Sequence, residues 1–208
     1  MESTDVLVIG SGIAGLCAAI EAARTGATVT VASAGKTMSG SSFFPGTWGL
    51  GLIGPVDEDD EQDLIDTIQT VGGGVADPEL VQTFVHGIPQ AIEWLEQDLG
   101  VELQRPQSAE SAQQKQFIPC FDHKTRMWRG LTRKPLEDAL TTRIESLGIR
   151  LLPAMSLSTL LRTRTGRITG NHALRPHRKS NRALLLPRPR SSQPVAQAAC
   201  SSAAFTSG

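Results

Sequence analysis

Residues 5–15 read Asp-Val-Leu-Val-Ile-Gly-Ser-Gly-Ile-Ala-Gly, and this stretch decides the fold. A buried apolar strand, residues 6–9, runs into the three glycines of the stretch. An alanine-rich segment with helical character, residues 16–24, follows, and a second strand, residues 27–31, comes directly after it. A strand, a glycine turn, a helix and a strand in this order predict a nucleotide-binding crossover. Such a unit brings backbone N–H groups and a helix N-terminus to a pyrophosphate.

Each glycine of the turn has a separate physical role. Gly10 permits the tight turn, Gly12 lets a phosphate approach the main chain, and Gly15 lets the helix lie close to the strand. A purely structural glycine turn is the alternative, but the strand before and the helix and strand after favour dinucleotide binding. The candidate cofactor-binding residues here are Gly10, Ser11, Gly12, Ile13, Ala14 and Gly15.

Composition limits the class of protein. The chain has 208 residues, 39% hydrophobic and 4% aromatic, with no Tyr. Its cysteines, Cys17, Cys120 and Cys200, form no CxxC pair and no His/Cys cluster, so we expect no metal site and no disulfide framework. The sequence shows no apolar run long enough to span a membrane and no signal peptide before the first strand, which predicts a cytoplasmic protein.

Charge is distributed unevenly along the chain. Residues 1–145 hold all 21 acidic residues and 10 basic ones, whereas residues 146–208 hold 10 basic residues and no acidic one. A split of this kind is compatible with a basic tail that binds nucleic acid. The N-terminal two-thirds does not support that alternative, and we expect no nucleic-acid partner.

Glycines, prolines and acidic stretches mark the boundaries of the expected elements in the rest of the chain. Residues 36–56 are rich in Gly and Ser and predict a long functional loop. Acidic residues 57–61 open a helix that ends at the glycines of 72–74. Asp77 and Pro78 begin the next helix. Pro89 begins a further helix, which ends near Gly100.

The last third predicts a helix at 135–147, a strand at 149–152 and a hairpin over 157–168. Residues 104–116 are polar and predict a mobile loop. Residues 171–208 have no clear period, so we expect them to be largely disordered.

Four short motifs carry a resemblance to a known family: Gly40-Ser41-Ser42, Ala76-Asp77-Pro78, Trp94-Leu95 and Gly100-Val101. With the first crossover, they make residues 3–170 similar to the N-terminal part of the flavoproteins that include L-aspartate oxidase, fumarate reductase and succinate dehydrogenase. The resemblance implies an α/β fold, a Rossmann-like doubly wound parallel sheet that binds FAD. It also implies that the domain, residues 1–170, is incomplete.

Two departures from common patterns bear on the FAD site. Many dinucleotide folds end the second strand with an acidic residue that holds the ribose, but this chain has Ser33-Ala34-Gly35, as in the aspartate oxidases. The hydroxyl is a weaker ribose ligand, and Ser33 ending a strand is the alternative. No His lies between residues 1 and 85, so we expect FAD to be bound without a covalent link.

The glycine-rich loop supplies the remaining candidates. By resemblance, residues 40–51 place serines near the pyrophosphate or the flavin, and an ordinary polar loop is the alternative. The candidate residues are Gly40, Ser41, Ser42 and Gly49. Pro45 and Trp48 depart from the family pattern and leave the substrate open. An anaerobic glycerol-3-phosphate dehydrogenase-like flavoprotein subunit and a reductase of another small acid are the rivals.

The residues that perform chemistry in the family are not recognisable here, so the catalytic residues are unknown. One dense cluster is present, and we expect it to support the flavin site or to lie on the surface rather than to be catalytic. Its members are Asp122, His123, Arg126, Trp128 and Arg129. The family's closing Ala-Thr-Gly-Gly strand is missing after residue 170. An Arg-, Pro-, Ser- and Ala-rich tail takes its place, which suggests a frameshift or truncation near residue 170.

The function implied by the resemblance is hydride transfer between the N5 atom of FAD and a small carboxylic acid or dicarboxylic acid. An electron-transfer subunit is a possible partner. A non-catalytic FAD-binding fragment or subunit is one alternative, and a binding protein with a basic tail is another.

Overall fold

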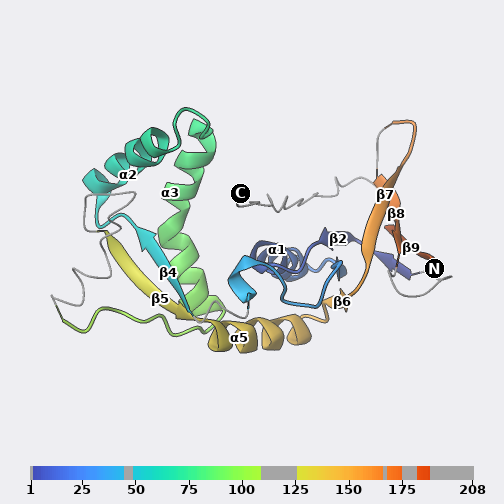
Figure 1. Cartoon of the computed structure of the whole chain (residues 1–208). Helices are drawn as coiled ribbons and strands as arrows, with labels where there is room; N and C mark the ends of the chain where they lie inside the picture. The colour runs from blue at the N-terminus through green and yellow to red at the C-terminus, as the bar shows by residue number, and fades with distance from the viewer. Residues whose placement is uncertain (1, 45–48, 109–125, 166–167, 175–181, 188–208) are drawn as a thin grey trace. The chain divides into compact units, whose positions relative to one another are not determined.

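The computed structural model describes residues 2–44, 49–108, 126–165, 168–174 and 182–187. The chain divides into two compact units (Figure 1). Residues 1–47 and 140–208 make up the first, and residues 48–139 the second. Each unit is described by itself.

A parallel sheet forms the centre of the first unit. Its strands are β2 (Val6–Ile9), β3 (Val29–Ala32) and β6 (Arg150–Leu152), in the order β2-β3-β6. Helix α1 (Ile13–Arg24) connects β2 to β3 and packs against both (Figure 1). The predicted crossover is therefore confirmed, with the helix beginning three residues earlier than expected. Its buried core consists of Val8, Leu16, Ala19, Ile20, Val29 and Val31.

A second sheet of this unit has the strand order β1-β9-β8-β7. These strands are β1 (Glu2–Thr4), β7 (Ser156–Arg162), β8 (Ile168–Leu174) and β9 (Arg182–Pro187). Strands β7 and β8 pair antiparallel, which confirms the predicted hairpin. The expectation of disorder is wrong for residues 171–174 and 182–187, because pairing with neighbouring strands satisfies their backbone groups. The other residues of 171–208 lie outside the described part.

Two antiparallel strands and two helices build the second unit. Strand β4 (Gly49–Gly54) pairs with β5 (Met127–Thr132), and helices α2 (Glu58–Val71) and α3 (Pro78–Glu93) pack against each other. The prediction of a loop throughout 36–56 is wrong for residues 49–54, and residues 41–43 form a short 3-10 turn. Glycine is unfavourable inside a strand, so residues 49–54 form a strand only because they pair with a distant partner.

Helices α2 and α3 start where predicted, the predicted cap at Asp77 is confirmed, and the structure adds a cap at Asp57. The Asp57 carboxylate accepts a hydrogen bond from the N–H of Asp60 at 2.9 Å, and the Asp77 carboxylate accepts one from the N–H of Glu79 at 2.9 Å. Helix α2 ends at Gly72, and Gly73 and Gly74 follow with positive φ. These contacts satisfy the first N–H groups of each helix, so the caps hold α2 and α3 at their starts. The core between the helices is Leu64, Ile65, Val81, Val85 and Ile88.

The prediction of a new helix at Pro89 is wrong, because α3 runs continuously from Pro78 to Glu93 with Pro89 inside it. A π-helical turn, Trp94–Asp98, then continues the chain. Pro89 is exposed, while Val85 and Ile88 of the same helix are buried. Burial of that apolar face outweighs the one hydrogen bond that proline removes.

The predicted helix at 135–147 is α5 (Arg133–Ser146), and Gly148 just beyond it has φ +64°. Within the described residues, no helix is both long and apolar enough to cross a membrane.

Candidate functional site

The glycine turn that follows β2 is constrained twice by the protein's own backbone. Gly10 has φ +105°, which favours glycine over residues with a side chain. Its N–H donates to the carbonyl of Ala32 at 2.8 Å and extends the ladder between β2 and β3. A Cβ on Gly15 would lie 2.2 Å from the carbonyl oxygen of Gly10. Positions 10 and 15 therefore require glycine for the fold itself.

Gly12 is different, because neither strain nor crowding requires it. Its φ is −72°, and a Cβ there would meet nothing nearer than the carbonyl oxygen of Ser39 at 3.5 Å, an ordinary contact. Gly12 is the N-cap of α1, and no side chain caps this helix end. The first N–H groups of α1 and the positive end of its dipole lie at Gly12 and form a cradle without a side-chain cap. This cradle suits an anion such as a pyrophosphate.

The loop after β3 comes back to this turn. A Cβ on Gly40 would lie 3.5 Å from the Cα of Gly12, and Gly40 itself has φ +128°. The short turn Ser41–Phe43 begins directly after Gly40, with Phe43 buried. The structure thus brings the predicted residues Gly12 and Gly40 together. The carbonyl oxygen of Ser39, which sequence reasoning missed, lies 3.5 Å from where a Cβ on Gly12 would be, and Ser39 carries no pattern that would have identified it.

The segment after β3 is held from the other side by residues 154–155. The N–H of Met155 donates to the carbonyl of Ser33 at 2.8 Å, and the N–H of Ala154 donates to the carbonyl of Gly35 at 2.9 Å. Ser33 is buried, whereas Ala34 and Gly35 are exposed. Only tertiary structure could show this support, because some 120 residues separate the two segments.

Two of the candidate cofactor-binding residues, Ser11 and Gly49, differ from the rest in what they contact or in the unit they belong to. The Ser11 hydroxyl donates to the carbonyl of Lys36 at 3.3 Å, so this side chain ties the glycine turn to the loop after β3. Gly49 is the first residue of β4 and belongs to the second unit, whereas the other candidates belong to the first.

Cys17 lies on α1, close in sequence to the glycine turn. Burial raises the pKa of its thiol to about 11, and the nearby Glu21 carboxylate adds to the rise, against a smaller lowering by a backbone hydrogen bond. The group therefore stays a thiol at neutral pH and is no nucleophile.

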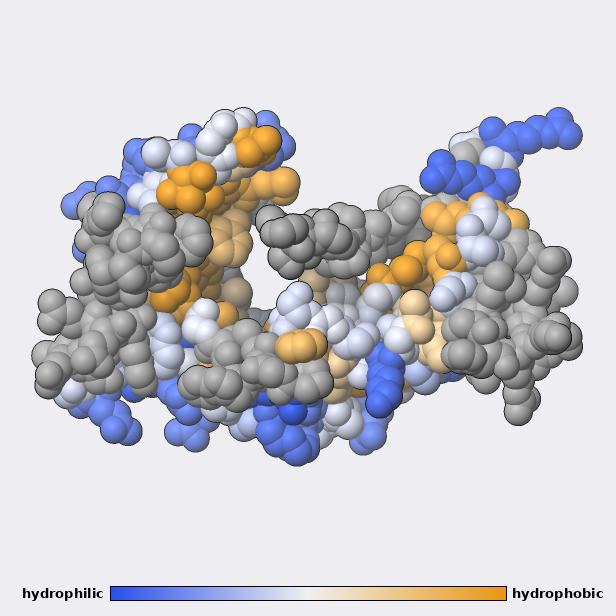
Figure 2. All heavy atoms as spheres, in the orientation of Figure 1, coloured by the Kyte–Doolittle hydropathy of each residue, from blue (hydrophilic) through white to orange (hydrophobic). Residues whose placement is uncertain are grey.

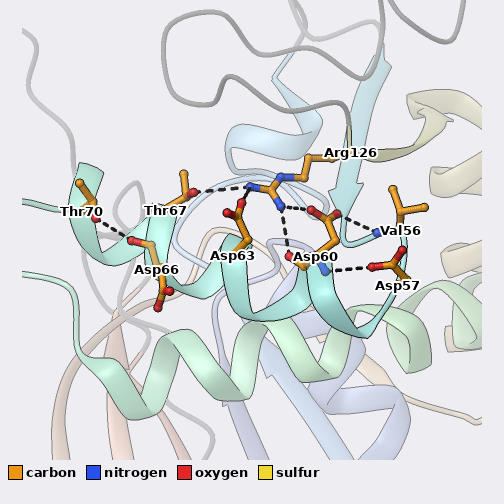
Figure 3. Close-up of polar contacts among 8 residues, drawn as sticks. All are labelled: Val56, Asp57, Asp60, Asp63, Asp66, Thr67, Thr70 and Arg126. Atoms are coloured by element: carbon orange, nitrogen blue, oxygen red, sulfur yellow. Dashed lines mark hydrogen bonds and ion pairs between the residues drawn. The ribbon is translucent and has the colours of Figure 1, made fainter.

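Part of the polar cluster around residue 126 lies inside the second unit. Arg126 is fully buried, and its guanidinium pairs with the carboxylates of Asp60 and Asp63 on α2 (Figure 3). It also donates to the carbonyl of Asp60 at 3.1 Å and to the Thr67 hydroxyl at 3.5 Å. The expectation that Arg126 lies on the surface is wrong, because these partners replace its hydration inside the unit.

The rest of that cluster is divided. The Trp128 indole lies over a glycine pair, since a Cβ on Gly51 would be 2.8 Å from its Nε1 and a Cβ on Gly130 would be 2.4 Å from its Cη2. Arg129 donates to the carbonyl of Trp128 at 2.8 Å. Asp122 and His123 lie outside the described residues. No group of His, Cys, Asp and Glu suited to a metal ion occurs in the described part of the chain.

A parallel strand–helix–strand unit whose glycine turn leaves a helix N-terminus open defines a dinucleotide-binding fold. The sequence model of the FAD binding domain family matches residues 5–198, and the chain belongs to this family. FAD is therefore the cofactor, and the uncapped N-terminus of α1 has the donor groups that a pyrophosphate requires.

Three relatives illustrate the similarity. The chain is 27% identical over 175 residues to the vinyl phenol reductase of Lactiplantibacillus plantarum, covering 81% of this chain and 33% of that protein. It is 43% identical over 91 residues to the L-aspartate oxidase of Halobacterium salinarum, covering 44% of this chain and 17% of that protein. A flavocytochrome c3 fumarate reductase shares the fold at TM-score 0.68 and 21% identity, over 89% of this chain and 32% of that one.

The chain thus spans about a third or less of the length of these relatives. The family match runs through residue 198, which counts against an out-of-frame tail that begins near residue 170. The reading frame itself stays a prediction.

Proposed function

We propose that the protein is an FAD-dependent oxidoreductase of the aspartate oxidase and fumarate reductase type, with this chain supplying the cradle for the dinucleotide. The observation that carries the proposal is Gly12: the fold does not need a glycine there, but an approaching phosphate does. FAD, when bound, accepts or donates a hydride.

The candidate residues of the first unit have a place in this proposal. The backbone N–H groups of residues 12–15 hold the pyrophosphate at the open end of α1, and Ser11 keeps the turn against the following loop. Ser33, Ala34 and Gly35 face the adenosine ribose at the end of β3, where the Ser33 hydroxyl takes the place of the usual carboxylate. The loop residues Gly40, Ser41 and Ser42 approach the pyrophosphate or the flavin. No covalent bond to FAD is expected.

FAD binding is the first test. The Gly12→Ala variant is expected to bind FAD at least about tenfold more weakly, because the added Cβ narrows the cradle. The matched control is Gly87→Ala, because Gly87 lies in α3 of the second unit and a Cβ there meets nothing within 4 Å. Binding is measured by titrating FAD against the change in its visible spectrum. Equal affinity in all three proteins would contradict the proposed cradle, and release of free FAD on acid precipitation would establish non-covalent binding.

Two substrate classes are supported by the relatives. The L-aspartate oxidase similarity favours a small dicarboxylic acid. The vinyl phenol reductase match covers much more of this chain and favours an apolar ring compound as a second candidate. Turnover of L-aspartate, succinate, fumarate or 4-vinylphenol by the FAD-loaded protein separates them.

If the protein binds FAD but turns over none of these compounds, the alternative of a non-catalytic FAD-binding subunit is favoured. An electron-transfer subunit is the partner we propose for that case. Copurification of a second redox protein with the FAD-loaded chain would support this partner.

A further inference from the structure

A pocket of about 640 Å³ lies within the second unit, between α2, α3 and β4. Leu52 and Ile53 of β4, Ile68 of α2 and Ile88 and Ile92 of α3 are among its walls. Figure 2 shows hydrophobic surface over α3 and β4 of this unit. The volume falls in the range of about 300–1,000 Å³ that small-molecule pockets occupy.

The pocket carries no charge. Every residue that lines it is glycine or apolar, with the exception of Thr67. An ionised carboxylate would lose its hydration there without meeting a cation. A neutral molecule is therefore the occupant that the lining accepts.

Thr67 is the only residue of the pocket lining whose side chain carries a hydroxyl. Its Oγ1 accepts a hydrogen bond from the buried Arg126 guanidinium at 3.5 Å (Figure 3). The hydroxyls of Thr70 and Thr83 instead donate to the carbonyl four residues earlier, each at 2.8 Å. Among the described residues, the Thr67 hydroxyl donates to no acceptor, so its hydrogen is available. A cation on its acceptor side also makes it a better donor.

We propose that this pocket binds a neutral ring compound with one acceptor oxygen, such as a cyclic ketone. The ring fills the apolar space, and its oxygen accepts a hydrogen bond from Thr67. A second copy of the chain is the alternative occupant. It would cover the pocket with an extended surface rather than place one acceptor oxygen at Thr67. The inference does not depend on FAD binding, because every residue involved belongs to the second unit.

The test compares 1-tetralone with tetralin, which has the same fused rings without the oxygen. Isoleucine methyl groups labelled with carbon-13 are followed by NMR during each titration. Ile53, Ile68 and Ile92 line the pocket, while Ile20 and Ile144 in the first unit serve as internal controls. We expect saturable shifts at the pocket methyls only, with 1-tetralone bound about five- to tenfold more tightly than tetralin.

Two variants make the test specific. Thr67→Val removes the hydroxyl at nearly constant shape and is expected to abolish the preference for 1-tetralone. The matched control Thr83→Val is expected to keep it, because Thr83 lies on α3 outside the pocket. If Thr67→Val does not fold, Ala91→Trp is used instead, which fills the pocket and should abolish binding of both compounds.

Three results would overturn the proposal. They are non-saturable shifts spread over both units, an unchanged preference in Thr67→Val, and pocket shifts that follow protein concentration rather than ligand. The last would mean that a second copy covers the pocket. Loss of FAD binding alone would leave the proposal standing, so its failure and that of the redox function are distinguishable.

Discussion

At the scale of single residues, three glycines of one turn are needed for three different reasons. Gly10 needs its positive φ, Gly15 needs room beside the Gly10 carbonyl, and Gly12 needs neither. The sequence motif treats them as equivalent members of one pattern. The structure shows that the fold requires glycine at positions 10 and 15, and that neither strain nor crowding requires it at position 12.

Gly15→Ala is expected to destabilise the protein by about 1–3 kcal/mol, since overpacking a tight contact costs that much. The added Cβ would sit 2.2 Å from a backbone carbonyl oxygen, which cannot rotate away. Urea unfolding measures the effect. Gly87→Ala, in the open interior of α3, should instead stabilise by about 0.5–1 kcal/mol. Equal midpoints for the two variants would contradict this interpretation of the turn.

Arg126→Met is expected to destabilise by about 3–5 kcal/mol, because it leaves the Asp60 and Asp63 carboxylates beside an uncharged side chain. Lys134→Met is the control, since Lys134 pairs with Asp138 on an exposed helix surface. That change should shift stability by no more than about 0.5 kcal/mol. Thermal or urea unfolding of both variants checks the contrast, and a small effect at Arg126 would mean that its ion pairs are not formed.

Cys17 should react slowly with iodoacetamide at pH 8, because its pKa of about 11 leaves very little thiolate. The rate should rise about tenfold per pH unit until the pH approaches the pKa. The measurement uses a background in which Cys120 and Cys200 are replaced by serine. A rate at pH 8 equal to that of free cysteine would show that the thiol is not buried in solution.

At the scale of elements, the pairing of β4 with β5 depends on glycine in an unusual way. Gly51 and Gly130 are direct partners, and the Trp128 indole covers both. An aromatic ring over paired glycines restores the apolar contact that glycine itself lacks. Strand β4 depends on its pairing with the distant strand β5, which explains why the sequence alone predicted a loop.

Gly130→Ala should destabilise by about 1–3 kcal/mol, because its Cβ would be 2.4 Å from Trp128 Cη2. Combining it with Trp128→Leu should recover part of the loss, since the smaller side chain leaves room. A double-mutant cycle by urea unfolding measures this coupling. Strict additivity of the two changes would show that the indole does not lie over Gly130.

At the scale of the whole molecule, the crossover of the first unit and the pairings of the second unit differ in the reach of their contacts. The crossover of the first unit is built largely from residues 5–32, so its pattern is visible locally. The second unit brings residues 49–54 against 127–132 and residues 60–67 against Arg126. These contacts join segments some 60 to 80 residues apart.

The whole chain is expected not to bind nucleic acid, since 21 acidic residues balance 20 basic ones. A labelled DNA 20-mer should show no binding in fluorescence anisotropy at 150 mM salt. Affinity that falls steeply as salt rises would support the alternative of a binding protein with a basic tail.

The sequence by itself determined the crossover, the acidic start of α2, the cap at Asp77 and the glycine turn, because these depend on backbone preferences and neighbours within a few residues. It also led to FAD through its family motifs. Only the tertiary structure decided that residues 49–54 form a strand, that α3 continues through Pro89 and that Arg126 is buried. It alone separated Gly12 from its neighbours and formed the pocket beside Thr67. The physical reason is that burial and pairing between distant segments outweigh local propensity, and no local pattern records them.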